Sequence, residues 1–183
     1  MITLPKPRQL PFYGKPSFYN SLRTSSKIRS LNPFQFLVRK ILNHLLLLTA
    51  YSCPINSIRV VCNRWRGVQI GKGVFIGLNC ILDRAYPEYI VLEDNSMLAG
   101  NVYLLTHSRA PEYYKGKLLS YVAPIHIKKY AWLGINVTIL PNVTIGEGSV
   151  ISAGSVVSEN IPNHVVARGN PAQIIKVFPG VEG

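Results

Sequence analysis

The sequence predicts an all-β fold, in which six-residue repeats wind into a parallel β-helix behind a basic N-terminal arm and one amphipathic helix. Three observations support it: a regular spacing of aliphatic residues, small residues at fixed offsets from them, and basic charge concentrated near the N-terminus. The aliphatic residues fall six apart in three series, which are Ile70, Ile76 and Leu82, then Leu92, Leu98 and Leu104, and finally Ile127, Leu133, Ile139, Ile145, Ile151 and Val157.

An α-helix does not fit this spacing, because six residues turn a helix by about 600° and move the apolar position by about 240° at each repeat. Short strands do fit it, since six is a multiple of the two-residue period of a strand. Gly71, Gly77, Gly134 and Gly146 each follow one of the aliphatics, and glycine permits a corner between strands. Each fully buried aliphatic contributes about 1.5–3 kcal/mol, so the stacked repeats make a substantial core.

Two breaks in the six-residue rhythm mark insertions. Four extra residues intrude around the sequence AYPEY, and 23 residues, which is not a multiple of six, separate Leu104 from Ile127. We therefore expect residues 108–126 to leave the coil as a loop that starts at His107, and long loops on rigid scaffolds often carry function. The predicted organisation is an arm and helix over residues 1–66, the β-helix over 67–162 and a C-terminal tail over 163–183.

The segment after the Pro- and Ser-rich arm has the pattern of an amphipathic helix that ends near Pro54. Asn32 suits the N-cap and Pro33 the first helical position. Its apolar positions follow helical spacing and are Phe34, Leu37, Val38, Ile41, Leu42, Leu45 and Leu48. The helix is too short to span a bilayer. Two interpretations stay open: the apolar face packs on the body or a neighbouring subunit, or residues 1–50 rest on an anionic membrane.

The charge is unevenly distributed along the chain. Residues 1–67 contain eleven Lys and Arg and no Asp or Glu, whereas the remainder is nearly neutral and the total is +12. Such a segment suits nucleic acid, an anionic membrane or an acidic substrate, but no nucleic-acid motif accompanies it, so we expect no nucleic-acid partner.

The cysteines and the N-terminus indicate the compartment. Cys53, Cys62 and Cys80 lack the close spacing of a zinc site or a disulfide framework, and Cys80 is interpreted as core packing. The first thirty residues hold no continuous apolar core, so no secretory signal is expected. We therefore expect a cytoplasmic location. If residues 1–50 rest on an anionic membrane, the protein would lie at the inner membrane face.

Four stretches resemble one family: VQIGKGVFIG, LLTHS, AWLGINVTILPNVTIGEGSVISAGSVVSENIP and VVARGNPAQIIK. They are similar to the hexapeptide-repeat acyltransferases, in the branch of maltose, galactoside and polysaccharide O-acetyltransferases. The N-terminal part, which leads into CNRWRGVQIGKG, looks like colanic-acid and capsular-polysaccharide acetyltransferases. The resemblance implies a left-handed β-helix, a homotrimer with active sites between subunits, and acetyl-CoA lying along the coils.

His107, in LLTHS, matches the catalytic histidine of the family. A hydroxyl attacks a thioester poorly until a base takes its proton, and an imidazole, whose ordinary pKa is about 6.5, suits that task at neutral pH. No Ser-His-Asp arrangement or reactive cysteine is evident in the sequence, so we expect direct transfer in a ternary complex. A backbone N–H is the expected donor to the oxyanion.

The resemblance also implies residues that bind acetyl-CoA and the acceptor. The acetyl-CoA residues are Trp132, Gly134, Ala153 and Ser158 along the acyl and pantetheine arm, and Arg168 and Lys176 at the phosphates. Asn79 and Asp83 match positions that hydrogen-bond sugar hydroxyls, and Tyr113 in the long insertion could stack on a sugar ring. Each has a structural alternative, such as coil packing for the small residues and a corner position for Asn79.

The predicted function is an acetyl-CoA-dependent O-acetyltransferase that acts on a sugar or polysaccharide precursor. Transfer to the amine of a nucleotide sugar or amino sugar is the near alternative, and a non-catalytic β-helix scaffold is the distant one. A metal-dependent hydratase on the same repeats needs three histidines around the metal, whereas the repeats hold only His107 and His126. We therefore expect no metal.

Overall fold

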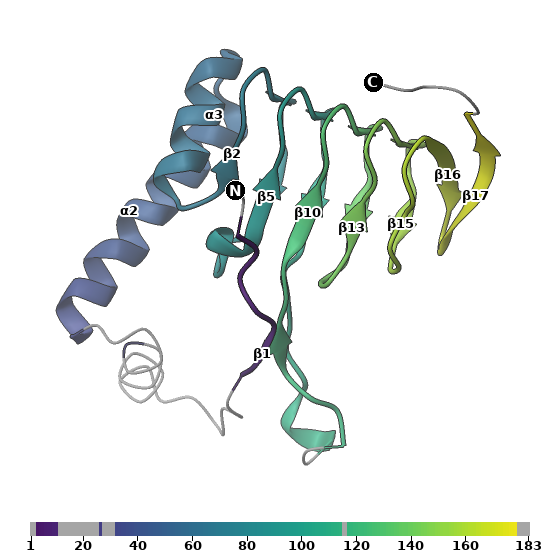
Figure 1. Cartoon of the computed structure of the whole chain (residues 1–183). Coiled ribbons are helices and arrows are strands. Elements are labelled where there is room, and N and C mark those ends of the chain that lie inside the picture. Colours follow the sequence, from purple (N-terminus) through teal and green to yellow (C-terminus); the bar gives the residue numbers. More distant parts are fainter. Residues whose placement is uncertain (1–2, 11–25, 27–31, 115–116, 179–183) are drawn as a thin grey trace.

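The computed structural model describes residues 3–10, 26, 32–114 and 117–178. A stack of coils forms the body, two helices cover its N-terminal end, and an arm projects from its side (Figure 1). The core is a column of buried aliphatic side chains along the axis of the stack. The fold is thus broader than the predicted all-β class, because the helical part contributes two helices that pack on the first coil.

Three parallel sheets form the sides of the coils. The first sheet contains β2 (Gln69–Ile70), β5 (Ile90–Leu92), β10 (Ile125–Ile127) and β13 (Thr144–Ile145). The second contains β3 (Phe75–Ile76), β6 (Met97–Leu98), β11 (Trp132–Leu133), β14 (Val150–Ile151) and β16 (Val165–Gly169). The third contains β4 (Ile81–Leu82), β7 (Tyr103–Leu104), β12 (Thr138–Ile139) and β15 (Val156–Val157).

The register confirms the six-residue prediction. Equivalent aliphatics of successive coils stand in line, as Leu92, Ile127 and Ile145 do in the first sheet. Ile127 and Ile145 are 18 residues apart, so one regular coil uses three repeats. The line continues through an isolated parallel bridge between Ile145 and Ile161.

The corners between sheets explain the recurrent Asn and Gly. Asn79, Asn101 and Asn136 occupy the corner between the second and third sheets of successive coils, and all three have a left-handed backbone with φ near +60°. Asn101 and Asn136 donate their N–H groups to the coil below, to the carbonyls of Leu78 at 2.9 Å and Gly100 at 3.2 Å. Asn79, on the first coil, donates to the Tyr51 carbonyl of the helical part at 3.0 Å. Asn79 is therefore at a corner, as its structural alternative predicted.

The predicted helix is confirmed as α2 (Pro33–Ser52), whose N-cap Asn32 accepts a hydrogen bond from Gln35 N–H at 2.7 Å. A second helix, α3 (Asn56–Trp65), follows it and was not predicted. α3 presents polar side chains to the coils: Arg59, Asn63 and the following Arg66 are buried. A helix whose polar side faces inward escapes a search for apolar periodicity.

Three arginines cap the first coil, which has no coil below it to accept or donate hydrogen bonds. Arg64 donates to the Ile70 carbonyl, Arg59 to the Ile76 carbonyl and Arg66 to the Leu82 carbonyl. Each carbonyl ends one side of the coil, so the three side chains satisfy one exposed group on each sheet edge. Part of the basic charge that suggested an anionic partner is therefore structural.

The long insertion forms an arm rather than an irregular loop. β8 (His107–Ser108) and β9 (Tyr121–Val122) are antiparallel, and a short 3₁₀ helix, η2 (Glu112–Tyr114), lies between them. β1 (Arg8–Gln9) adds to β9, so part of the predicted N-terminal arm is a strand, while residues 1–2, 11–25 and 27–31 lie outside the described residues. The coil resumes at Ile125, two residues before Ile127, where the sequence predicted that it would resume.

The C-terminal segment closes the stack. β16 pairs with β14 in parallel and continues the second sheet beyond the predicted boundary at residue 162. β17 (Ala172–Val177) then turns back and pairs with β16 in antiparallel register. What the sequence predicted as a tail is therefore a hairpin over the last coil (Figure 1).

Candidate active site

His107 lies where the arm leaves the coil, and the structure pairs it with Asp83. The imidazole Nδ1 is 2.7 Å from Oδ2 of Asp83, which follows β4 of the coil below. Because an ionised carboxylate only accepts hydrogen bonds, Nδ1 carries the proton and Nε2 keeps its lone pair. The His107 side chain is partly exposed, so this lone pair is placed to take a proton from a bound molecule.

Asp83 is held from several sides. Its side chain is 1% exposed. Oδ1 accepts the N–H groups of Ala85 at 2.7 Å and Tyr86 at 3.1 Å, and Oδ2 accepts both the N–H and the hydroxyl of Thr106 at 2.8 Å. Burial by itself raises the pKa of Asp83, but the hydrogen bonds from His107, Ala85 and Thr106 and the charge interaction with His107 outweigh it and lower the pKa to about 2.

This geometry changes the expected role of Asp83. A sugar hydroxyl would need a free carboxylate oxygen, whereas both oxygens already accept two or three hydrogen bonds from the protein. The structure therefore favours Asp83 as the residue that orients His107 over the predicted contact with a sugar.

The four-residue insertion around AYPEY supplies a wall of the site. The ring of Tyr86 meets the imidazole of His107 edge to face, with centroids 5.4 Å apart. The guanidinium of Arg8, from β1, lies 5.7 Å from the centroid of the same tyrosine ring. Thr106 and Arg8 were not predicted as site residues, although the motif LLTHS marked the segment that contains Thr106.

Arg66 fixes the backbone that carries Asp83. Its guanidinium donates to the carbonyls of Leu82 and Asp83, to Asn43 Oδ1 at 2.8 Å and to Asn63 Oδ1 at 2.7 Å. Burial lowers the pKa of Arg66 to about 10, partly offset by Asp83, so the side chain stays charged at neutral pH. Through the buried guanidinium of Arg66, both helices are therefore connected to the Asp83–His107 pair.

The predicted acetyl-CoA residues lie mainly along the second sheet and the corner that follows it. Trp132 is exposed on β11, and Gly134 and Ala153 stand at this corner in successive coils. A Cβ on Gly134 would lie 2.7 Å from the Ala153 nitrogen, so the close stacking of the coils requires the glycine. Arg168 and Lys176 are both exposed on the C-terminal hairpin.

One chain does not bring these residues to His107. Trp132, Gly134 and Ala153 belong to the second sheet and its corner, whereas His107 follows the third sheet. Ser158, directly after β15, stands at the same corner as His107 but two coils further along. Tyr113 lies in η2 on the arm and is almost fully exposed, with its ring against Tyr114.

The second histidine of the repeats has a different setting. His126 Nε2 is 2.6 Å from Oε1 of Glu93, on the first sheet of the coils. Both side chains are largely buried, which favours a structural role for His126. Within the described ranges, no group of three or more His, Cys, Asp or Glu is placed to hold a metal ion.

Comparison with known proteins matches the repeats on both sides of the arm. Residues 124–159 match the family described as bacterial transferase hexapeptide (six repeats), and residues 67–106 match the hexapeptide repeat of succinyl-transferase. A Staphylococcus aureus protein named as an acetyltransferase is 40% identical over 109 residues, 60% of this chain. The chain spans only about half the length of that relative, 54%.

Two solved structures share the fold. A maltose O-acetyltransferase from Clostridium difficile 630 superposes with a TM-score of 0.58 and 29% identity, over 79% of this chain and 86% of that one. A galactoside acetyltransferase in complex with coenzyme A has a TM-score of 0.55 and 25% identity, over 76% and 80% of the two chains. With its two matched repeat regions and its coils of three hexapeptides, this chain is similar to the hexapeptide-repeat acyltransferases in both sequence and fold.

Proposed function

We propose that this protein transfers the acetyl group of acetyl-CoA to a hydroxyl of a sugar or polysaccharide precursor, with His107 as the general base. The observation that carries the proposal is the Asp83–His107 pair at the base of the arm, with Nδ1 bonded and Nε2 left to act. The names of the maltose and galactoside acetyltransferases that share the fold support the acyl donor and the sugar acceptor.

The proposed reaction has two steps: the hydroxyl attacks the thioester, and the tetrahedral intermediate then breaks down. Nε2 of His107 takes the hydroxyl proton while the oxygen attacks the thioester carbonyl. The tetrahedral intermediate then expels the CoA thiolate as the C–S bond breaks, and the imidazolium returns its proton to the sulfur. Asp83 keeps the ring oriented and stabilises its positive charge between the two proton transfers.

The residues present suit acetyl-CoA as co-substrate. Trp132 offers an exposed aromatic face, and the close stacking at Gly134 and Ala153 leaves a smooth corner along which an extended pantetheine arm can lie. Arg168 and Lys176 are exposed cations at the far end of the same sheet, suited to the CoA phosphates.

We further propose that the active site is completed between chains of a homotrimer with left-handed coils. Trp132, Gly134 and Ala153 lie on the second sheet and its corner, whereas His107 follows the third sheet, so a neighbouring subunit would bring its own second-sheet corner to this histidine. Tyr113 lies on the exposed arm, and Asn79 lies at the corner between the second and third sheets. Both remain predicted contacts to the acceptor, which they would reach across the same interface.

Thiol release from acetyl-CoA tests the function directly. The full chain is incubated with acetyl-CoA and a panel of free sugars, oligosaccharides, amino sugars and nucleotide sugars. We expect thiol release with a hydroxyl acceptor, and a product whose acetyl group hydroxylamine removes, because esters react with it and amides do not. A product that resists hydroxylamine would select the amine alternative, and no release with any acceptor would favour a scaffold.

A further inference from the structure

We propose that the outward side of the two helices binds the surface of an anionic lipid bilayer. This docking face consists of Phe34, Ile41, Leu45 and Leu48 on α2 and of Ile58 and Trp65 on α3, all of them exposed. Phe34 and Trp65 are each 74% exposed, among the highest values for apolar residues of the described chain. These residues take no part in the proposed acetyl transfer, so the membrane proposal and the proposed function can be tested independently of each other.

The apolar stripe of α2 faces away from its own chain. The residues of α2 that are buried are Phe36, Leu47 and Ala50. Phe34, Ile41, Leu45 and Leu48 are separated by seven, four and three residues, which places them on one line of the helix, opposite the buried line. The sequence interpretation in which this face packs on the body of the same chain is therefore wrong.

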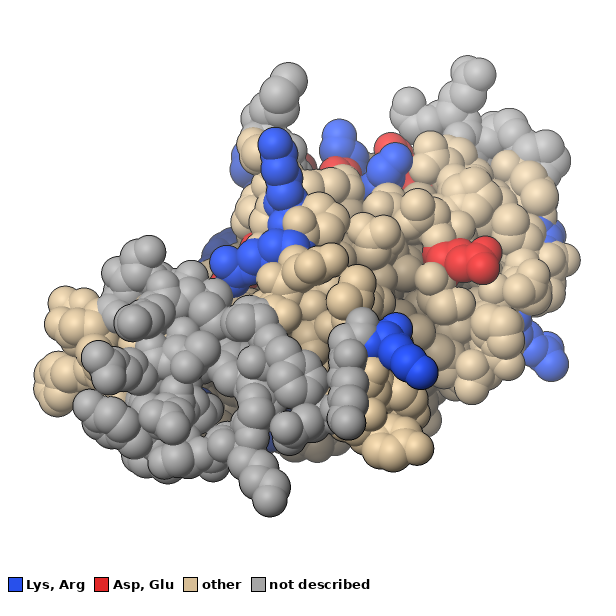
Figure 2. Space-filling view, turned by 90° about the horizontal axis from the view of Figure 1, so that it is seen from below, with Lys and Arg blue, Asp and Glu red and all other residues tan. Residues whose placement is uncertain are grey.

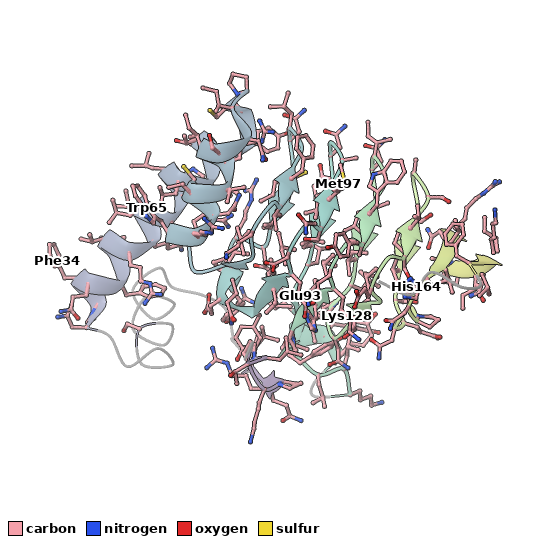
Figure 3. The ribbon with its side chains drawn as sticks, turned by 45° about the horizontal axis from the view of Figure 1, so that its top comes forward. Phe34, Trp65, Glu93, Met97, Lys128 and His164 are labelled. Carbon is pink, nitrogen blue, oxygen red and sulfur yellow. The ribbon has the colours of Figure 1, made fainter. Side chains whose placement is uncertain are left out.

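α3 has the same inverted arrangement. Its buried side carries Arg59 and Asn63, which bond to the first coil and to the helix, together with Val60, which joins the core. Ile58 and Trp65, seven residues apart, lie on the other side. Figure 3 shows Phe34 and Trp65 on the helical end of the molecule, away from the strands. Two helices that lie side by side at one end of the stack (Figure 1) thus carry exposed apolar side chains.

The charge around this face identifies the occupant. Neither α2 nor α3 contains an Asp or Glu, so the only acidic or basic side chains on the two helices are basic. Arg39 and Lys40 are exposed on α2 outside the apolar line. An apolar helix face with a basic polar side is typical of helices that lie in the interface of an anionic bilayer. On the face shown in Figure 2, basic side chains likewise stand out among few acidic ones.

Other occupants fit less well. A second copy docked by the same face would bring two segments of like charge together, which opposes the contact. Insertion across the bilayer is also disfavoured, because no helix in the described parts of the chain has the length and apolar character to cross it. A bilayer on this face would lie beside the first coil, which carries Asp83.

Sedimentation with vesicles tests the proposal. The full chain is mixed with vesicles of phosphatidylcholine alone or with phosphatidylglycerol added, at low and at high salt. We expect binding only to the anionic vesicles, and weaker binding at high salt because ions screen the attraction. Leu45→Glu should reduce binding roughly tenfold or more, since it places a charge in the centre of the apolar line.

The matched control is Ile175→Glu on β17, at the opposite end of the stack (Figure 1). Ile175 is 58% exposed and Leu45 is 53% exposed, so both variants add one negative charge to an apolar surface site without opening the core. Ile175→Glu should bind as the unmodified chain does.

Three results would overturn the proposal. The unmodified chain could fail to sediment with anionic vesicles at low salt, or Leu45→Glu could bind as well as Ile175→Glu. Light scattering could instead show that Leu45→Glu alone lowers the oligomeric mass, which would make the face a contact between subunits. Circular dichroism of both variants checks that they keep the same secondary structure.

Discussion

The imidazole of His107 depends on a carboxylate that lies 24 positions earlier in the chain. The motif LLTHS predicted the histidine, but its partner followed only from the stacking of β4 under β7, which brings Asp83 beside Thr106. The sequence did single out Asp83, with a sugar contact as its expected role. A residue type at a coil corner does not reveal whether the side chain points to solvent or to a neighbour.

Asp83→Asn should lower kcat by roughly 100-fold or more, because an amide can stabilise the wrong imidazole tautomer and cannot offset the imidazolium charge. The KM for acetyl-CoA should stay unchanged, since Asp83 contacts no part of the proposed acetyl-CoA site. Steady-state kinetics separate the two constants. An equal loss in kcat and rise in KM would instead indicate a general disturbance of the fold.

The same carboxylate should make stability depend on pH. Its pKa is lowered from 3.8 to about 2, so it contributes about 2 kcal/mol to the free energy of unfolding above its unfolded pKa, and this contribution is lost as the pH falls towards 2. Urea unfolding of the unmodified chain and of Asp83→Asn should differ by that amount at pH 6 and converge at the acid end. A constant difference across this range would contradict the low pKa.

The two helices show why element types were easier to predict than their orientation. α2 was predicted from its caps and period, yet its apolar line points outward, while α3 turns arginine and asparagine side chains inward. The cause is the open edge of the first coil, whose carbonyls need donors more than they need apolar cover. A periodic pattern does not disclose such an edge.

Arg66→Met should therefore damage both stability and turnover. It leaves the carbonyls of Leu82 and Asp83 and two asparagine side chains without their donor, at a cost of about 3 kcal/mol in unfolding free energy. It should also lower kcat, because the backbone of Asp83 loses its anchor. Arg39→Met on the exposed side of α2 is the control, with an expected change within about 0.5 kcal/mol. Equal effects of both substitutions would contradict the anchoring role.

For the molecule as a whole, the repeat predicted nearly the entire coil body. A period of six appears in the sequence because each side chain of the column must return to the interior, and all three sheets keep that register. The arm and its added strand β1 could not be predicted in the same way, since Arg8 and Val122 pair across more than a hundred residues and neither belongs to the six-residue repeat.

Complementation between chains tests the proposed trimer. His107→Gln removes the base. Ala153→Trp places a large side chain at the exposed corner after the second sheet, where the pantetheine arm is proposed to lie. Each variant alone should be nearly inactive. When the two are unfolded and refolded together, about a quarter of the sites should combine an intact base with an intact corner and regain activity. Absence of any recovery would place the whole site within one chain.

The most direct measurement compares the turnover of His107→Gln with that of His126→Gln, using thiol release from acetyl-CoA with the acceptor found in the screen. His126 is paired with Glu93 on the first sheet rather than with Asp83, and it serves as the control imidazole. We predict that His107→Gln lowers kcat by at least about 100-fold while His126→Gln stays within a few-fold of the unmodified chain. Full turnover in His107→Gln would contradict the account, because the account assigns the proton transfer to this imidazole.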